Sequence, residues 1–343
     1  MPENLTRRGI LAAGGALGIT ALLAACGDDK SGGSDSGAAK ETKKDGPWSF
    51  KDDRGETAQK PTAPKNIVAF TGTAAALHDY GVEVKGVFGP TKTADGKADV
   101  QAGDLDVNKV EIIGNVWGEF NIEKYAALAP EVLITGMYDK GALWYVPDES
   151  KDKILKLAPS VALMVARETM PKVLERHAQL AESLGADLKS TAVADARTRF
   201  EKAAEELRSA AKSNPGVKVL IASGSADILY ISTPELSADL LYFQELGVEI
   251  VVPDREKLDE GGWFESLSWE NADKYAADVI LLDNRTGTLQ TDQLKDKPTW
   301  AKLPAVAAGQ VVPRVTEPVF SYDKCAPILE DLAKTILAAK KVS

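Results

Sequence analysis

The chain has 343 residues, with 51 acidic against 41 basic side chains and a formal net charge of −10 at neutral pH. This excess of acid disfavours a nucleic-acid partner, because such partners are bound through clusters of Lys and Arg. Only two cysteines and two histidines are present, so a zinc or iron site of three or four protein ligands is not expected.

The first residues predict an export signal. Arg7 and Arg8 precede an uncharged run, Gly9–Ala25, that is too short and too rich in small residues to span a membrane. We therefore expect a signal peptide over residues 1–25. The paired arginines also resemble a twin-arginine export signal, and the general secretory route is the alternative. Removal of this segment, which also holds Glu3, would change the net charge from −10 to −11.

The end of that segment resembles a bacterial lipobox, Leu22-Leu23-Ala24-Ala25-Cys26-Gly27. In such signals the cysteine thiol is lipidated, and cleavage makes Cys26 the new N-terminus. Two or more acyl chains anchor a protein stably, so we expect attachment to the outer face of the cytoplasmic membrane. Residues 26–47 are rich in Gly, Ser, Asp and Lys, and they predict a disordered tether. Lipidation of Cys26 leaves Cys325 without a disulfide partner, and we expect Cys325 to be buried.

The body contains a weak internal repeat of apolar strands and helices. Asn121 and Ser268 are the expected N-caps of two matching helices in the two halves. The expected strands lie at 67–70, 86–88 and 132–134 in the first half and at 219–222, 249–252 and 279–282 in the second. This alternation predicts an α/β fold of two Rossmann-like lobes with parallel sheets, over residues 48–168 and 214–343.

A long helical stretch separates the two halves. Residues 169–213 begin near Pro171, are dominated by strong helix formers, and end at Asn214-Pro215-Gly216. A spanning helix of this length would act as a stiff spine with a ligand cleft between the lobes. The alternative is a pair of enzymatic nucleotide-binding lobes, but neither first strand leads into a Gly-rich phosphate loop.

Four patterns then occur in a characteristic order. They are Pro64-Lys65-Asn66-Ile67-Val68, Asn121-Ile122-Glu123 with Leu128-Ala129-Pro130-Glu131-Val132-Leu133-Ile134, Leu267-Ser268-Trp269-Glu270, and Trp300-Ala301-Lys302-Leu303-Pro304-Ala305-Val306 with Gly309-Gln310-Val311. From about Pro64 to Val342, the chain resembles the helical-spine substrate-binding proteins of ABC importers for siderophores, haem and vitamin B12. Within that family it looks most like the actinomycete ferrioxamine-binding lipoproteins.

The resemblance implies a monomeric binding protein that catalyses no reaction and delivers its ligand to an ABC permease dimer with its ATPase. It places one exposed glutamate on each lobe, at Glu123 and Glu270, to meet arginines of the two permease copies. The alternative role of both carboxylates is a favourable interaction with a helix N-terminus.

Aromatic and arginine side chains cluster where the repeat predicts loops at strand ends, which is where open α/β folds bind ligands. The resemblance implies ligand contacts at Trp117, near Phe264, and in the loop of Phe320 and Tyr322, and an arginine at Arg285. The candidate ligand-binding residues are Trp117, Tyr138, Trp144, Tyr145, Arg167, Tyr230, Trp263, Phe264, Arg285, Phe320 and Tyr322. Packing inside the core is the alternative for any single aromatic residue.

These side chains suit a pre-chelated metal. Trp and Tyr offer flat walls for aliphatic arms, and Tyr and Arg donate to iron-bound oxygens, so the protein supplies no metal ligand and needs no cofactor. We expect an Fe(III)-siderophore complex of the hydroxamate, ferrioxamine-like type. Cobalamin, haem or a catecholate siderophore is the alternative, although the candidate loops hold few cations for a catecholate. A surface-anchored enzyme and a lipoprotein that only senses or scaffolds are further alternatives.

Overall fold

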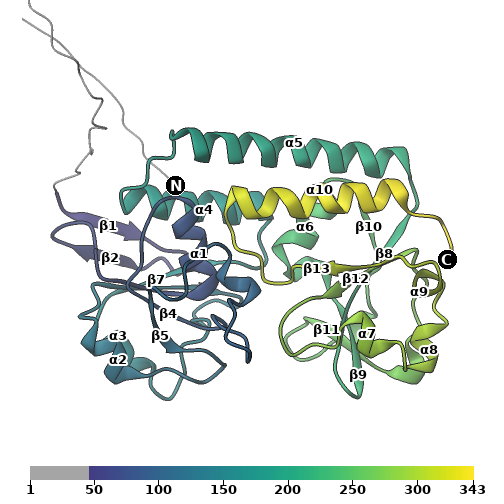
Figure 1. The fold of residues 1–343 in the computed structure, drawn as a ribbon, viewed down its shortest axis with the longest axis horizontal. Coiled ribbons are helices and arrows are strands. Elements are labelled where there is room, and N and C mark those ends of the chain that lie inside the picture. The colour runs from purple at the N-terminus through teal and green to yellow at the C-terminus, as the bar shows by residue number, and fades with distance from the viewer. Residues whose placement is uncertain (1–45) are drawn as a thin grey trace, which may run out of the picture. The chain divides into compact units, whose positions relative to one another are not determined.

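The computed structural model describes residues 46–343 (Figure 1). The signal peptide expected over 1–25, the expected lipidation site Cys26 and nearly all of the expected tether, 26–47, lie outside the described residues. Between residues 46 and 343, no helix is both long and apolar enough to cross a membrane.

The first sheet has five strands, all parallel, in the order β5-β4-β3-β6-β7. Its central strands are fully buried, as their continuous apolar sequences predict for a sheet covered on both faces. The strands are β3 (Ile67–Phe70), β4 (Gly86–Phe88), β5 (Glu111–Gly114), β6 (Val132–Met137) and β7 (Ser160–Met164). The helices of this lobe are α1 (Thr71–Asp79), η1 (Val100–Ala102), α2 (Ile122–Ala127) and α3 (Lys151–Leu155).

A hairpin of β1 (Trp48–Lys51) and β2 (Thr57–Lys60) precedes this sheet and joins it at β7. Its turn carries two carboxylates that accept backbone N–H groups of β7. Asp52 accepts from Ala162 at 3.0 Å and Asp53 accepts from Met164 at 2.8 Å. The N–H of Asp53 also donates to the carbonyl of Ala162. The hairpin turn therefore hydrogen-bonds the outer edge of the last strand of the sheet.

The second sheet is mixed, with the order β11-β9-β8-β12-β13, and β10 also pairs with β8. Its parallel strands are β8 (Lys218–Gly224), β10 (Glu249–Ile250), β12 (Val279–Asp283) and β13 (Val311–Arg314). Unlike in the expected all-parallel sheet, β9 (Ile228–Ser232) runs in the opposite direction and pairs antiparallel with β8 on one side and with β11 (Phe264–Ser268) on the other. The reason is the short link after Gly224: Ser225 bonds Ile228, and so few residues cannot make a parallel crossover.

Several short helices cover the second sheet. They are η2 (Pro234–Leu236), α6 (Ala238–Glu245), η3 (Arg255–Lys257), η4 (Trp269–Asn271), α7 (Thr291–Leu294), α8 (Pro298–Ala301) and α9 (Pro304–Ala307). Asn121 caps α2 as expected, by accepting the N–H of Lys124 at 2.9 Å. The helix expected after Ser268 is only the single turn η4, without a side-chain cap. Burial of Trp269, whose indole N–H donates to Ser225, fixes this turn instead.

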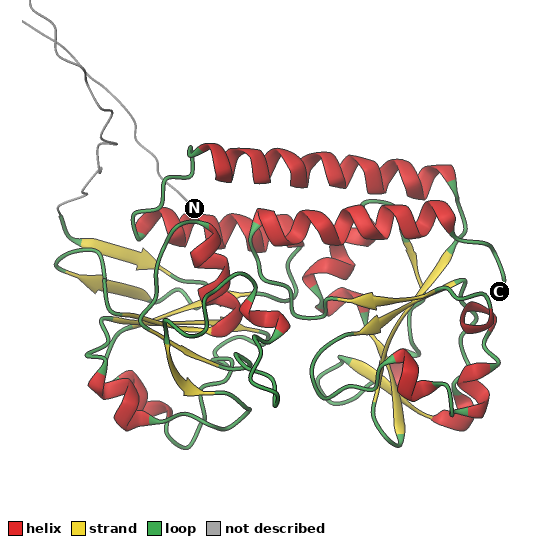
Figure 2. Cartoon of the chain, in the orientation of Figure 1, coloured by secondary structure: helices red, strands yellow, loops and turns green. Residues whose placement is uncertain are grey.

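The expected linker, 169–213, consists of two helices, α4 (Met170–Ser183) and α5 (Thr191–Ser213). The segment between them contains Gly185, whose φ is +107°. The 23 residues of α5 span about 34 Å and pass over both lobes (Figures 1 and 2). A last helix, α10 (Tyr322–Ala338), which the sequence did not predict, lies beside α5. Cys325 on α10 is buried, as expected.

Candidate ligand-binding site

A pocket of about 320 Å³ lies between the lobes, at the ends of strands from both sheets. The first lobe contributes Tyr138, Asp139 and Trp144, and the remaining lining residues are Ser232, Ser237, Trp263, Phe264, Arg285, Arg314, Thr316 and Glu317. The pocket therefore brings together five of the eleven predicted ligand-binding residues: Tyr138, Trp144, Trp263, Phe264 and Arg285. Its position agrees with the rule that open α/β sheets bind ligands beyond the carboxyl ends of their strands.

Aromatic rings in contact with one another form a wall of this pocket, and Trp117, which lies outside the pocket, continues this wall. The ring of Tyr138, which follows β6, lies 4.5 Å from Trp144 and 5.8 Å from Trp263 of the second lobe, measured between centroids. Trp144 in turn contacts Trp117 at 4.9 Å. Trp117 is 64 % exposed, so the aromatic wall extends outward to solvent. Burial raises the pKa of the Tyr138 phenol well above its ordinary value, so this hydroxyl stays protonated and able to donate.

The other predicted aromatic residues lie around or away from the pocket. Tyr145 packs between Trp117 and Phe70, and Tyr230 on β9 packs against Phe264 on β11. Phe320 is buried against His177 in a smaller cavity that Tyr138 and Trp144 also line.

Tyr322 is separated from the pocket. It was expected in a loop at the cleft, but it is the first residue of α10, where Ser321 caps the helix by accepting the N–H of Lys324. Its ring packs edge-on against Tyr80, which follows α1, and near Phe200 of α5. Tyr322 therefore belongs to the packing of the spine.

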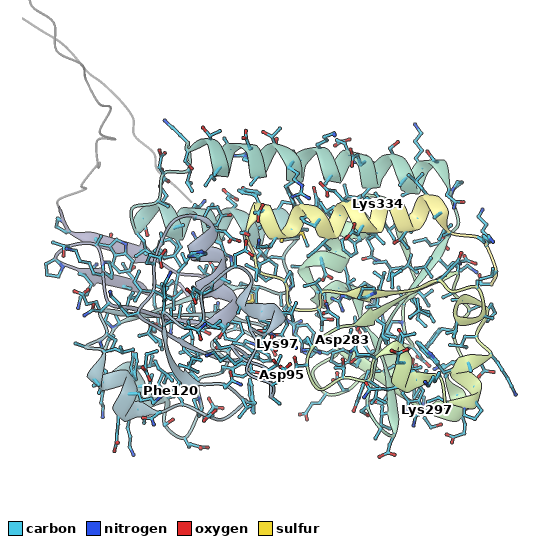
Figure 3. All side chains as sticks on the ribbon, in the orientation of Figure 1. Asp95, Lys97, Phe120, Asp283, Lys297 and Lys334 are labelled. Carbon is cyan, nitrogen blue, oxygen red and sulfur yellow. The ribbon has the colours of Figure 1, made fainter. Side chains whose placement is uncertain are left out.

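Arg285 is held by two carboxylates. Its guanidinium donates to Asp283 at 2.7 Å and to Glu317 at 2.6 Å. Burial alone would lower the pKa of Arg285, but the hydrogen bond to Asp283 and the charge of Glu317 raise it. Asp283 is the last residue of β12 and lies on the side of the second lobe that faces the first (Figure 3).

The other two arginines near the pocket are also paired. Arg314 and Asp239 form a buried ion pair with two hydrogen bonds of 2.9 Å. Arg167 donates to Asp139 at 2.7 Å. Together with Asp283 and Glu317, the three arginines face four carboxylates. The immediate surroundings of the pocket therefore carry no surplus of positive charge.

Two polar contacts join the lobes behind the pocket, and the sequence did not predict them. The amide of Gln101 donates to Glu317 at 3.0 Å, and the hydroxyl of Thr286 donates to Asp99 at 2.8 Å. Both first-lobe partners belong to the short η1 segment, which Asp99 caps. Among the carboxylates at the pocket, Asp283 is the one that the sequence could have indicated, because it ends an apolar strand two residues before the predicted Arg285.

One buried hydrogen-bond donor at the pocket remains free. The indole N–H of Trp144 is buried and has no partner within residues 46–343. Because buried donors are normally paired, this N–H is suited to an acceptor oxygen of a bound molecule. Over the same residues, no three His, Cys, Asp or Glu side chains gather in a way that could hold a metal ion.

The two predicted docking glutamates are both exposed. Glu123 lies in the first turn of α2 and Glu270 in η4. Trp269 of η4 lies 5.1 Å beneath the ammonium group of Lys297. Both α2 and Lys297 lie on the side of their lobes that is away from α5 (Figures 1 and 3). Hydrogen bonds from its own backbone N–H and from Ser268 lower the pKa of Glu270, so this carboxylate is charged near neutral pH.

Comparison with known proteins gives consistent matches. The sequence profile of the periplasmic binding protein family matches residues 68–313. The structure of DesE, a ferric-siderophore receptor protein from Streptomyces coelicolor, is 59% identical with a TM-score of 0.84 and covers 86% of this chain and 100% of that chain. The petrobactin-binding protein YclQ from Bacillus subtilis is similar in fold, at 17% identity and a TM-score of 0.62, over 84% of this chain and 98% of that chain. Comparison with curated protein sequences finds no match.

Proposed function

Because the chain belongs to the periplasmic binding protein family, we propose that it captures a ferric siderophore outside the cytoplasmic membrane and delivers it to an ABC importer. The observation that carries this proposal is the aromatic pocket between the lobes, in a chain 59% identical to a ferric-siderophore receptor protein. The protein binds and releases its ligand, catalyses no reaction and uses no cofactor. The iron is cargo, held entirely by the chelate.

The charges at the pocket support a ferric hydroxamate of the ferrioxamine type. A ferric complex of three hydroxamates is neutral, whereas a complex of three catecholates carries several negative charges. Every arginine near the pocket is already paired with a carboxylate, so none is free to balance an anionic complex. A polyanion would also lie close to Glu317 and Asp139, which line the pocket, and like charges disfavour that complex strongly.

The lining side chains give each part of such a chelate a partner. Tyr138, Trp144, Trp263 and Phe264 offer flat surfaces to the aliphatic arms. The unpaired N–H of Trp144 donates to an iron-bound oxygen, which carries partial negative charge.

The finer location and partners also belong to this proposal. Cys26 carries the lipid anchor, and residues 26–47 tether the body to the membrane. The lobes are residues 48–168 and 214–343, with residues 169–213 between them, and the protein acts as a monomer. Glu123 and Glu270 are supported as docking residues by their exposure. Glu123 is on α2 and Glu270 follows Trp269, which contacts Lys297, and both α2 and Lys297 lie on the side opposite α5, where a two-fold symmetric permease could contact both lobes.

Intrinsic tryptophan fluorescence tests the ligand. A panel of a ferric tris-hydroxamate, a ferric catecholate, haem and cobalamin is titrated into the protein, because Trp144 and Trp263 line the pocket. The expected result is saturable quenching by the ferric hydroxamate and weaker quenching by the others. Unchanged emission across the whole panel would contradict a solute-binding function, and preferential binding of the catecholate would contradict the charge argument.

Iron uptake tests the docking role. A Glu123→Ala, Glu270→Ala double variant should bind the ferric hydroxamate with unchanged affinity but fail to support its uptake by cells. Glu168→Ala, which removes another exposed carboxylate, serves as the control and should support normal uptake. Normal uptake in the double variant would exclude these glutamates as docking residues.

A further inference from the structure

Arg167 lies where the first lobe touches the second. It follows β7, and its backbone N–H donates to the carbonyl of Leu236 at 3.1 Å. The neighbouring Ala166 forms an isolated antiparallel bridge with Ser237, which lines the pocket. This short contact joins the last strand of the first sheet directly to the segment before α6. The backbone on both sides of Arg167 is therefore fixed to both lobes.

The backbone of Arg167 has an uncommon conformation. Its φ is +60°, in the left-handed region that non-glycine residues rarely adopt. Such conformations persist only where the surrounding structure imposes them, and they concentrate at functional sites. At Arg167 this conformation coincides with the hydrogen bond to Leu236 and with side-chain contacts to Asp139 and Trp263. The conformation directs the chain from β7 toward α4 while the side chain returns to the pocket rim.

The side chain of Arg167 bridges the same two lobes. Its guanidinium donates to Asp139 of the first lobe at 2.7 Å and lies 5.7 Å from the ring centroid of Trp263 in the second. Both partners line the pocket, whereas Arg167 itself is exposed and does not. The guanidinium thus covers the rim of the pocket from outside, next to the contact between Tyr138 and Trp263.

We propose that Arg167 is a positioning residue that clamps Asp139 to Trp263 and so controls passage of ligand at this side of the pocket. It is then not a donor to the ligand. This inference rests on the proposed function for the identity of the ligand, but the clamp itself is a property of the protein alone. The clamp exists with and without ligand, so it slows both association and dissociation and has little effect on the dissociation constant.

The variant Arg167→Asn tests the clamp, because Asn tolerates the left-handed backbone and cannot reach both partners. From the usual strength of an exposed ion pair and a cation–π contact, we expect kon and koff for a ferric tris-hydroxamate to rise together by about three- to tenfold. Kd should change less than about twofold. If Arg167 were instead a ligand donor, koff alone would rise and Kd would weaken. Stopped-flow tryptophan fluorescence measures both rates.

Asp139→Asn should reproduce the effect, and the double variant should add little to either single variant. Glu168→Gln is the matched control, because this neighbouring exposed side chain has no hydrogen bond or ion pair within the described part of the chain. Additive effects of the two single variants, or unchanged rates in Arg167→Asn, would overturn the proposal.

A ligand-free measurement separates this proposal from the proposed function. In the protein without ligand, Arg167→Asn should accelerate amide hydrogen exchange in the peptides that contain residues 165–167 and 236–237. Glu168→Gln should leave exchange there unchanged. If no chelate binds but exchange accelerates, the clamp stands and the ligand assignment fails. Unchanged exchange in Arg167→Asn would refute the clamp, whatever the ligand.

Discussion

The buried ion pair between Asp239 and Arg314 should contribute far more to stability than an exposed pair of the same geometry. The two side chains are 3 % and 4 % exposed, and two hydrogen bonds of 2.9 Å join them. In Asp239→Asn, the guanidinium of Arg314 would stay buried without a counter-charge. Removing one partner of a buried pair typically costs about 3–5 kcal/mol, and we expect about 3 kcal/mol because Asn keeps one acceptor.

An internal control exists on the spine. Arg199 and Glu330 form a similar pair of hydrogen bonds at 2.8 Å, but their side chains are 47 % and 23 % exposed. Glu330→Gln should therefore lower the free energy of unfolding by less than about 1 kcal/mol. The two variants remove the same charge from the same kind of bond and differ mainly in burial.

Urea unfolding followed by circular dichroism measures both losses, and calorimetry should show a melting temperature about 6–12 °C lower for Asp239→Asn. Adding Arg314→Gln should recover a large part of the loss, because it removes the unpaired charge. Equal effects of Asp239→Asn and Glu330→Gln, or a loss below about 1 kcal/mol in the former, would refute the reasoning.

Three further predictions concern the loops and the pocket. A Cβ atom at Gly114 would overlap the carbonyl oxygen of Glu119, so Gly114→Ala should lower the free energy of unfolding by about 1–3 kcal/mol and shift the fluorescence emission of Trp117. Gly46→Ala is the control, because its added Cβ lies in open space, and it should change neither quantity. Burial lowers the pKa of His177 to about 4, below its value in the unfolded chain. The free energy of unfolding should therefore fall by up to about 3 kcal/mol as the pH drops from about 6.5 to 4, and urea unfolding of His177→Met should lack this pH dependence. Trp144→Phe keeps an aromatic ring, although a smaller one, and removes the unpaired N–H. Calorimetric titration should therefore show about two- to tenfold weaker binding of the ferric hydroxamate, and an unchanged Kd would show that this N–H does not reach the ligand.

Much of the fold could be predicted because its strands are continuous apolar runs. β3 begins and ends where the sequence predicts, and Asn121 caps its helix. The predictions fail where the local sequence does not determine which strand or side chain an element packs against. The antiparallel β9 depends on a short turn after Gly224, and the single turn η4 depends on the burial of Trp269. Helix α10 was not predicted, because it follows the last expected strand and lies outside the internal repeat.

The candidate site shows the same limit. Strand-end aromatic residues and Arg285 could be predicted, since the carboxyl ends of strands meet at one edge of each sheet. Apart from Asp283, the carboxylates that neutralise the arginines could not, because they are distant from those arginines in the chain: Asp239 and Arg314 are 75 positions apart. Tyr322 was assigned to the cleft because it lies next to Phe320. The helix that begins at Tyr322 turns its ring toward the spine.

The hairpin at the start of the body has a consequence for association between copies of this chain. An open strand edge can pair with the edge of another molecule and so nucleate aggregation. Asp52 and Asp53 hydrogen-bond the backbone of β7 at that edge, 110 residues later in the chain. Because the hairpin precedes β7 in sequence, it is already synthesised when that strand forms. The outer edge of the first sheet is thereby protected against intermolecular strand pairing from the earliest stage at which the sheet exists.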